Sequence, residues 1–95
     1  MELNGKNISP EKKNMLLFMM LIKQHDEIAR MNLGEIPNPA TNLKEVDIKS
    51  ARFAIDTLEM IEIYTKGNLG NEAQTYLNHI LSSLKTKLAE ASENG

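Results

Sequence analysis

Apolar residues recur three or four positions apart in three stretches of the chain, and this spacing is the period of an α-helix. The helices are expected at residues 9–32, 47–66 and 71–91. The ends of the chain, residues 1–8 and 92–95, lack the period and are expected to be flexible termini. The pattern therefore predicts one all-α domain of three helices over residues 9–91.

Capping and breaking residues set these boundaries. Ser9 is a good N-cap and is followed by a proline at the first helical position, while Gly34 supplies the left-handed residue that ends this helix. Asp47 is a good N-cap for the second helix, and Gly67 ends it. The segment 34–46 contains two prolines and is longer than the roughly 2–8 residues usual between bundle helices, so it predicts a long loop.

The second and third helices differ in how much apolar surface they carry. The third has one apolar stripe: Ala73, Tyr76, Leu77, Ile80, Leu81, Leu84, Leu88 and Ala91. The second has a main stripe of Ala51, Ala54, Ile55, Leu58 and Ile61. It also has a second line at spacings of four, three and four, formed by Phe53, Thr57, Met60 and Tyr64. A second apolar line needs a second partner surface.

The first helix is apolar over an arc of roughly 220°, at about 100° per residue. One side carries Met15, Phe18, Ile22, Ala29 and Leu33, and the other carries Leu17, Met20, Leu21, Ile28 and Met31. A helix covered by two others buries a stripe only a little over 100° wide. The excess either pairs with copies of the chain, is covered by the 34–46 loop, or meets another protein or a lipid.

We interpret this excess as a self-association surface, giving a dimer or a larger homo-oligomer. The expected interface residues are Leu17, Met20, Leu21, His25, Ile28, Phe53, Met60 and Tyr64. A chain of 95 residues buries only about 60–65% of its unfolded surface, and this one has no cysteine for a disulfide. Further burial between copies would supplement a marginal core.

Charge and composition narrow the partners. The chain has 11 Lys and Arg against 13 Asp and Glu, and an isoelectric point of about 5.6, whereas nucleic-acid binders usually carry a basic stripe. The longest apolar run, Met15 to Ile22, spans roughly 12 Å of helix, too short for a bilayer. No small-residue cleavage site follows that run. We expect a cytoplasmic protein with no nucleic-acid or membrane partner.

His25 is the histidine nearest the middle of the apolar arc of the first helix. It is either a core or interface residue, bonded to a carbonyl or to its symmetry mate, or a metal ligand. The Glu-x-x-His signature of di-iron bundles is absent, because Glu62 and Thr65 stand three positions after Glu59 and Glu62. No nucleophile with a base beside it is visible in the pattern. We therefore assign no catalytic residue, metal or cofactor, and expect no enzyme.

The turn before the third helix offers one alternative site. Lys66, Gly67, Asn68 and Gly70 place a cation and free backbone N–H groups at the start of that helix. A helix N-terminus of this kind binds phosphate or carboxylate groups. The competing interpretation is structural: Gly67 ends the second helix, and Lys66 interacts with the negative end of its dipole.

Three segments carry a resemblance to a known family. In chain order they are Leu33-Gly34-Glu35-Ile36-Pro37-Asn38-Pro39, then Ala51-Arg52 with Ile55-Asp56-Thr57-Leu58, then Thr65-Lys66-Gly67-Asn68-Leu69. Over about residues 14–88 the chain resembles the bacterial domain-of-unknown-function family numbered eighteen forty-four. That family usually has threonine or serine next, as an N-cap, where this chain has Gly70, so Asn71 is expected to cap instead. The resemblance implies a small helical bacterial protein and brings no activity or catalytic residue.

The sequence thus predicts a non-enzymatic, homo-oligomeric interaction or scaffold protein. The alternative is an anion-binding or small-ligand-binding module that uses the turn from Lys66 to Gly70. An unidentified protein partner is a further alternative for the excess apolar surface.

Overall fold

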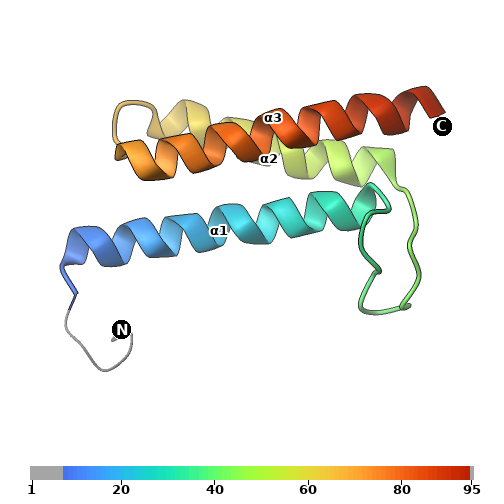
Figure 1. Cartoon of the computed structure of the whole chain (residues 1–95), viewed down its shortest axis with the longest axis horizontal. Coiled ribbons are helices and arrows are strands. Elements are labelled where there is room, and N and C mark those ends of the chain that lie inside the picture. Colours follow the sequence, from blue (N-terminus) through green and yellow to red (C-terminus); the bar gives the residue numbers. More distant parts are fainter. Residues whose placement is uncertain (1–7, 95) are drawn as a thin grey trace.

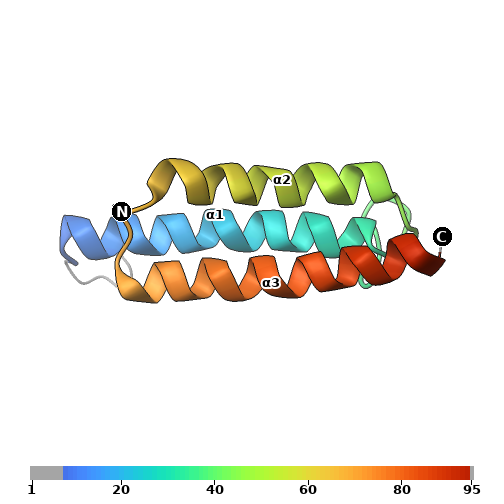
Figure 2. The same ribbon diagram turned by 90° about the horizontal axis from the view of Figure 1, so that it is seen from above.

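The computed structural model describes residues 8–94 and contains three α-helices within them: α1 (Pro10–Asn32), α2 (Ile48–Thr65) and α3 (Asn71–Asn94). The predicted all-α, three-helix fold is confirmed. Figures 1 and 2 show α2 running opposite to α1 and α3, and each helix contacts the other two. The expectation of a flexible N-terminus falls on residues 1–7, which lie outside the described residues, as does residue 95.

Local capping fixes both ends of α1. The hydroxyl of Ser9 accepts a hydrogen bond of 3.1 Å from the backbone N–H of Lys12, as expected of an N-cap. At the other end Gly34 has a φ of +81°. The N–H of Gly34 donates to Met31, and the N–H of Glu35 donates to Arg30. This is the Schellman arrangement, in which a left-handed residue lets the chain leave the helix with its last carbonyls bonded.

Helix α2 begins at an acidic cap. The carboxylate of Asp47 accepts hydrogen bonds from the backbone N–H of Ser50 at 3.1 Å and from its hydroxyl at 2.9 Å. These bonds, the backbone one first, hold the pKa of Asp47 below its usual value. Because only the ionised carboxylate accepts both bonds fully, ionisation of Asp47 favours the first turn of α2.

The turn between α2 and α3 differs in detail from the sequence prediction. Lys66 already has extended backbone angles, with φ −56° and ψ 129°, so α2 ends one residue earlier than expected. Gly67 follows with a φ of +85°, and the N–H of Asn68 donates to the carbonyl of Thr65 at 2.9 Å. These values define a type II turn, which requires a left-handed residue at its third position. Gly67 therefore completes a turn and does not cap α2.

Helix α3 begins at Asn71, as predicted, but its N-cap and its last residue differ from the prediction. The carbonyl of Gly70 accepts the first helical hydrogen bond, from the N–H of Gln74 at 3.0 Å. Asn71 is thus the first residue of the helix, and the expectation that it caps α3 is wrong. Glycine is tolerated at this position because it adopts the required backbone angles without strain. At the other end α3 continues to Asn94, beyond the expected Ala91, because no glycine or proline interrupts this stretch.

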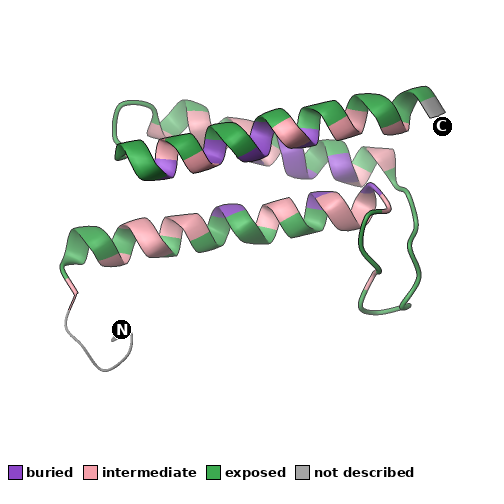
Figure 3. Cartoon of the chain, viewed as in Figure 1, coloured by how far each residue is buried: buried purple, intermediate pink, exposed green. Residues whose placement is uncertain are grey.

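All three helices contribute to one hydrophobic core, and its members are the stripes that the sequence predicts. The buried apolar residues are Ile22, Ala29, Leu33, Ala51, Ala54, Ile55, Leu58, Ala73, Leu77, Ile80, Leu81 and Leu84. Phe18, Ile61, Tyr76, Leu88 and Ala91 pack against them and are partly buried. Figure 3 shows the buried residues on the sides where the helices face one another.

The segment between α1 and α2 closes on itself at its base. Leu33 and Val46 form an antiparallel β-bridge, and the N–H of Asp47 donates to the carbonyl of Asn32 at 2.7 Å. Within the segment, the N–H of Asn38 donates to the carbonyl of Leu43 at 2.9 Å. These bonds join residues of the segment and its two ends to one another. The segment therefore forms a closed loop beside the C-terminal end of α1 (Figure 1).

The loop does not cover the excess apolar surface of α1. Its own apolar side chains Leu43 and Val46 are 59% and 58% exposed. Leu17 and Met20, toward the opposite end of α1, are exposed as well. The alternative in which the loop folds back over the first helix is therefore wrong, because the bonds at its base turn it away from those positions.

Arg30 ties the start of the loop to the helices. Its guanidinium donates to Asp26 at 2.9 Å and to Glu35 at 3.2 Å, and it reaches the hydroxyl of Ser83 on α3 at 3.5 Å. Glu35 in turn pairs with Lys87 of α3 at 3.2 Å. These partly exposed pairs fix the direction in which the chain leaves α1 more than they add to stability.

The two left-handed glycines provide a matched pair of variants. Alanine at either position carries the cost of a left-handed side chain, about 1–2 kcal/mol. A Cβ at Gly34 would also lie 2.9 Å from the Val46 side chain, whereas one at Gly67 would meet nothing within 4 Å. We expect urea denaturation to show a larger loss of unfolding free energy for Gly34→Ala than for Gly67→Ala. Equal losses would contradict the close packing of Val46 on Gly34.

The cap of α2 predicts a pH dependence. Because the folded-state pKa of Asp47 is depressed, its contribution is present above the unfolded value of 3.8 and is lost as the pH falls through the folded value. Asparagine retains the capping oxygen but does not titrate. We expect the melting temperature of the wild type to fall more steeply than that of Asp47→Asn on acidification below about pH 5. Parallel curves would contradict an ionised cap.

Candidate functional site

A continuous apolar surface lies on the side of α1 and α2 that faces away from α3. We call it the α1/α2 face and define it by nine residues: Leu17, Met20, Leu21, His25, Ile28, Phe53, Thr57, Met60 and Tyr64. Phe53 and Tyr64 are 75% and 79% exposed, and Met20 is 53% exposed. The other large apolar members are between 39% and 44% exposed. His25 and Thr57 are half-buried.

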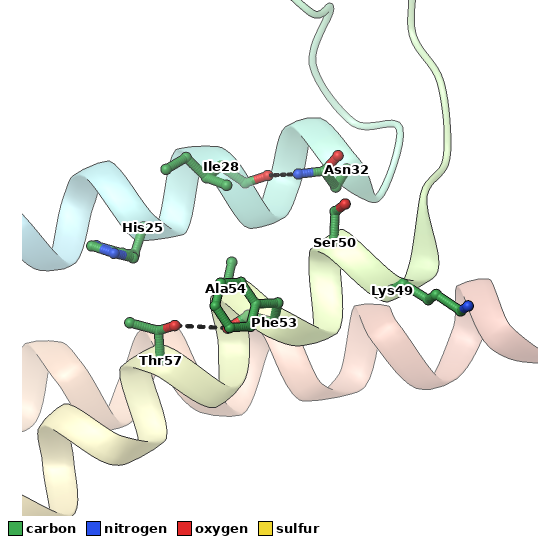
Figure 4. A pocket seen from close by; sticks show the side chains of 8 residues that line it. All are labelled: His25, Ile28, Asn32, Lys49, Ser50, Phe53, Ala54 and Thr57. Atoms are coloured by element: carbon green, nitrogen blue, oxygen red, sulfur yellow. Dashed lines mark hydrogen bonds between the residues drawn. The ribbon is translucent and has the colours of Figure 1, made fainter.

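An open groove of about 510 Å³ lies between the two helices at one end of this face, where α1 ends and α2 begins. His25, Ile28 and Asn32 line it from α1. Ser50, Phe53 and Thr57 are among the residues that line it from α2, and Figure 4 shows the side chains of both helices around it. The fold thus places residues of α1 and α2 that lie about thirty positions apart in the chain around one groove. Among them are His25, Ile28 and Phe53, which the sequence predicts to share one interface.

Polar groups in the groove are bonded within their own helices. The Nδ1 atom of His25 lies 3.0 Å from the carbonyl oxygen of Leu21, one turn earlier. The hydroxyl of Thr57 donates to the carbonyl of Phe53 at 2.8 Å, and the amide of Asn32 donates to Ile28 at 2.9 Å. His25 is therefore bonded to a carbonyl, one of the two arrangements expected for a histidine in an apolar arc. The groove presents apolar carbon to whatever covers it.

The size of the face exceeds what an isolated protein usually exposes. If a whole aromatic side chain offers about 200 Å², Phe53 and Tyr64 together leave roughly 300 Å² in water. The half-exposed leucine, isoleucine and methionine side chains of the face add to this area. The largest apolar patch on a typical monomer is about 300–600 Å² and is often functional. The α1/α2 face is at or above that limit.

Metal binding gains no support from the geometry. Within residues 8–94, no group of three or more His, Asp or Glu side chains is arranged to hold a metal ion. His79, on α3, is exposed and lines a different surface hollow from His25.

The expected anion site is divided by the turn. Lys66 and Gly67 are exposed, and a Cβ at Gly67 would meet nothing within 4 Å. Asn68 and Gly70 line a separate hollow of about 880 Å³ at the start of α1 and α3. That hollow carries two carboxylates, Glu11 and Glu72, and one ammonium group, Lys12. Its charge does not favour an anion, and the anion site remains a prediction from sequence.

Two features escaped the sequence analysis. Ile63 is 67% exposed on α2, and neither of the two lines predicted for that helix included it. The sequence could have indicated it, because Ile63 is apolar and lies next to the line of Met60 and Tyr64 on the helix surface. Arg30 connects α1, the loop and α3, and no local pattern identifies such a long-range clamp. Arg52 and Asp56, one helical turn apart on α2, are both exposed in the isolated chain.

A family model described as Domain of unknown function (DUF1844) matches residues 15–90. This match confirms the resemblance that the three sequence segments carry. No curated protein and no solved structure matches the chain significantly. Within the described residues, no helix is long and apolar enough to cross a membrane.

Proposed function

We propose that this chain, which belongs to the DUF1844 family, is a non-enzymatic cytoplasmic protein that assembles with copies of itself as a helical scaffold. The observation that carries the proposal is the α1/α2 face. Phe53 and Tyr64 are both more than 70% exposed on this face, and Phe53 lines its groove. Water contact of this kind is unfavourable by roughly 25 cal/mol per Å², and a partner surface removes it.

The pKa shifts of Lys85 and Arg30 arise from ion pairs outside the groove of the α1/α2 face. Perturbed pKa values tend to mark active sites. Here the hydrogen-bonded pair with Glu59 raises the pKa of Lys85, and that pair joins α2 to α3 at 2.7 Å. Burial lowers the pKa of Arg30, but its bonds to Asp26 and Glu35 outweigh burial and raise it. Each shift has a structural partner that accounts for it, and neither residue lines the groove of the α1/α2 face.

Self-association predicts a particle of twice the 10.7 kDa chain mass or more. We expect size exclusion with light scattering at micromolar concentration to report a dimer or a larger oligomer. Phe53→Glu and Met20→Glu should shift it to a monomer, because each places a charge in the buried centre or edge of the interface. Both sites are exposed within the subunit, so the isolated fold should survive.

His79→Glu provides the matched control, because His79 is exposed on α3, away from the α1/α2 face. It should leave the oligomer unchanged, and circular dichroism should show helical content for all three variants. A wild-type chain that is monomeric and well folded at these concentrations would contradict the proposal. Equal dissociation by His79→Glu would show that the α1/α2 face is not the surface involved.

A further inference from the structure

We propose that the partner of the α1/α2 face is the same face of a second copy, packed about a two-fold axis that runs parallel to the helices. The two subunits then form a four-helix bundle at the dimer centre, with one α3 on each outer side. This inference rests on the proposed self-association and specifies its geometry. Three observations carry it: the spacing of the exposed residues, their levels along the helices, and the residues at the edges of the face.

The exposed lines of both helices have coiled-coil spacing. On α1 the steps alternate between four and three through Leu17, Leu21, Gln24, Ile28 and Met31. On α2 the steps are four, three and four through Phe53, Thr57, Met60 and Tyr64. This alternation keeps a seam facing a nearly parallel or antiparallel helix, as in four-helix bundles. The core of the subunit uses other positions, such as Ile22 and Leu58, and residues 8–94 leave the large apolar side chains of both seams partly or largely exposed.

The groove fixes how the two seams are aligned within one subunit. Ile28 of α1 and Phe53 of α2 line it together, and α2 runs opposite to α1. Because both helices rise about 1.5 Å per residue, each step along α1 matches one step back along α2. The levels then pair four residues of α1 with four of α2: Leu17 with Tyr64, Leu21 with Met60, Gln24 with Thr57, and Ile28 with Phe53.

An axis parallel to the helices leaves every residue at its own level. Helix α1 therefore meets α2 of the second copy in the register just given, with antiparallel neighbours throughout. The polar seam residues Gln24 and Thr57 come to the same level, and apolar residues meet apolar residues at the other three paired levels. The Thr57 hydroxyl donates to Phe53 and keeps a lone pair that can accept from the Gln24 amide.

An axis perpendicular to the helices gives a poorer match. It reverses α1 against α1 of the second copy. With the axis midway between Leu17 and Ile28, the outermost of the four paired levels, Gln24 falls opposite Leu21. A polar amide is then buried against an apolar side chain, which costs free energy unless it finds another hydrogen-bond partner. The arrangement with the parallel axis avoids this mismatch.

The edges of the face agree with the parallel axis. Met20 on α1 and Ile63 on α2 are 53% and 67% exposed. They lie on corresponding outer edges of the seam, and in this register their levels differ by about two residues, or roughly 3 Å. In the proposed dimer each covers the other across the interface. If a second copy covers the exposed parts of these edge residues and of the α1/α2 face, the area buried on each subunit is on the order of 800 Å². A standard interface buries about this much per partner.

The same register also brings two carboxylates, Glu27 and Asp56, to within about two residues of the same level at the edge of the interface. Both are exposed, and Lys23 and Arg52 stand one turn before them on their own helices. These cations offset the repulsion at the solvent-exposed rim, where charge pairs contribute little either way.

The absence of cysteine from the chain allows a direct test of the register. A disulfide needs Cα atoms within about 7 Å, so it forms only between residues that truly meet. Met20→Cys and Ile63→Cys are purified separately, mixed, and oxidised mildly. We expect the mixture to yield covalent dimers on non-reducing gels, and each variant alone to yield none. His79→Cys, on the exposed surface of α3, controls for random collision.

A mixture of Leu21→Cys and Gln24→Cys, purified separately, tests the alternative axis, about which these two residues meet. The mixture should not cross-link about the parallel axis, because the two copies of α1 lie on opposite corners of the four-helix bundle. If it cross-links while the Met20→Cys and Ile63→Cys mixture does not, the perpendicular axis is correct and the inference is overturned. A dimer by light scattering with no cross-link in any sample also overturns the inference but leaves the proposed function intact. A monomer by light scattering overturns both.

Discussion

The three helices share one hydrophobic core, and the size of the side chains in that core determines which large apolar residues remain exposed. Where α1 meets α2, the buried residues include the alanines Ala29, Ala51 and Ala54, at 4% exposure or less. Small residues let helix axes approach closely, toward the lower end of the roughly 8–10 Å usual for packed helices. A close pair of helices has little room between them for large side chains. Phe53 and Ile28 are therefore held beside the contact and form the walls of an open groove.

Helix α3 completes the interior from one side only. Its single stripe, including Leu77, Leu81 and Leu84, is fully used by the core. Nothing in residues 8–94 performs the same task on the opposite side of α1 and α2, since the loop stays at the end of α1. The α1/α2 face is thus a direct consequence of an odd number of helices, two of which have apolar residues on two sides. A fourth helix packed on the side of α1 and α2 opposite α3 would cover the second apolar side of both helices.

The sequence predicted what local chemistry determines. Ser9, Gly34 and Asp47 act on the backbone within a few positions of themselves, so the residue type alone indicates where α1 starts and ends and where α2 starts. The turn after α2 was less predictable, because a glycine with positive φ fits both a helix cap and a type II turn. Only the backbone angles of Lys66 distinguish them. The path of the loop and the Arg30 clamp depend on contacts across the chain, which no local pattern reports.

For the candidate site, the periodicity identified the exposed residues but not their arrangement. Counting apolar positions on α1 and α2 indicated a surplus, and the surplus is exposed in the folded chain. The alignment of Ile28 with Phe53 could not be derived this way, because it depends on how the loop sets α2 against α1. Ile63 was missed because it is a single apolar residue outside both lines of α2, and one residue gives no periodicity.

Three helices that alternate in direction leave the start of α1 and the end of α3 at opposite poles of the bundle (Figure 1). A dimer related by an axis along the helices would preserve this difference, so that both copies of the first helix begin at one pole and both copies of the last helix end at the other. Such a dimer is polar along its axis, because its two ends carry different parts of the chain. Anything joined to the two ends of the chain would be sorted to separate sides of the assembly.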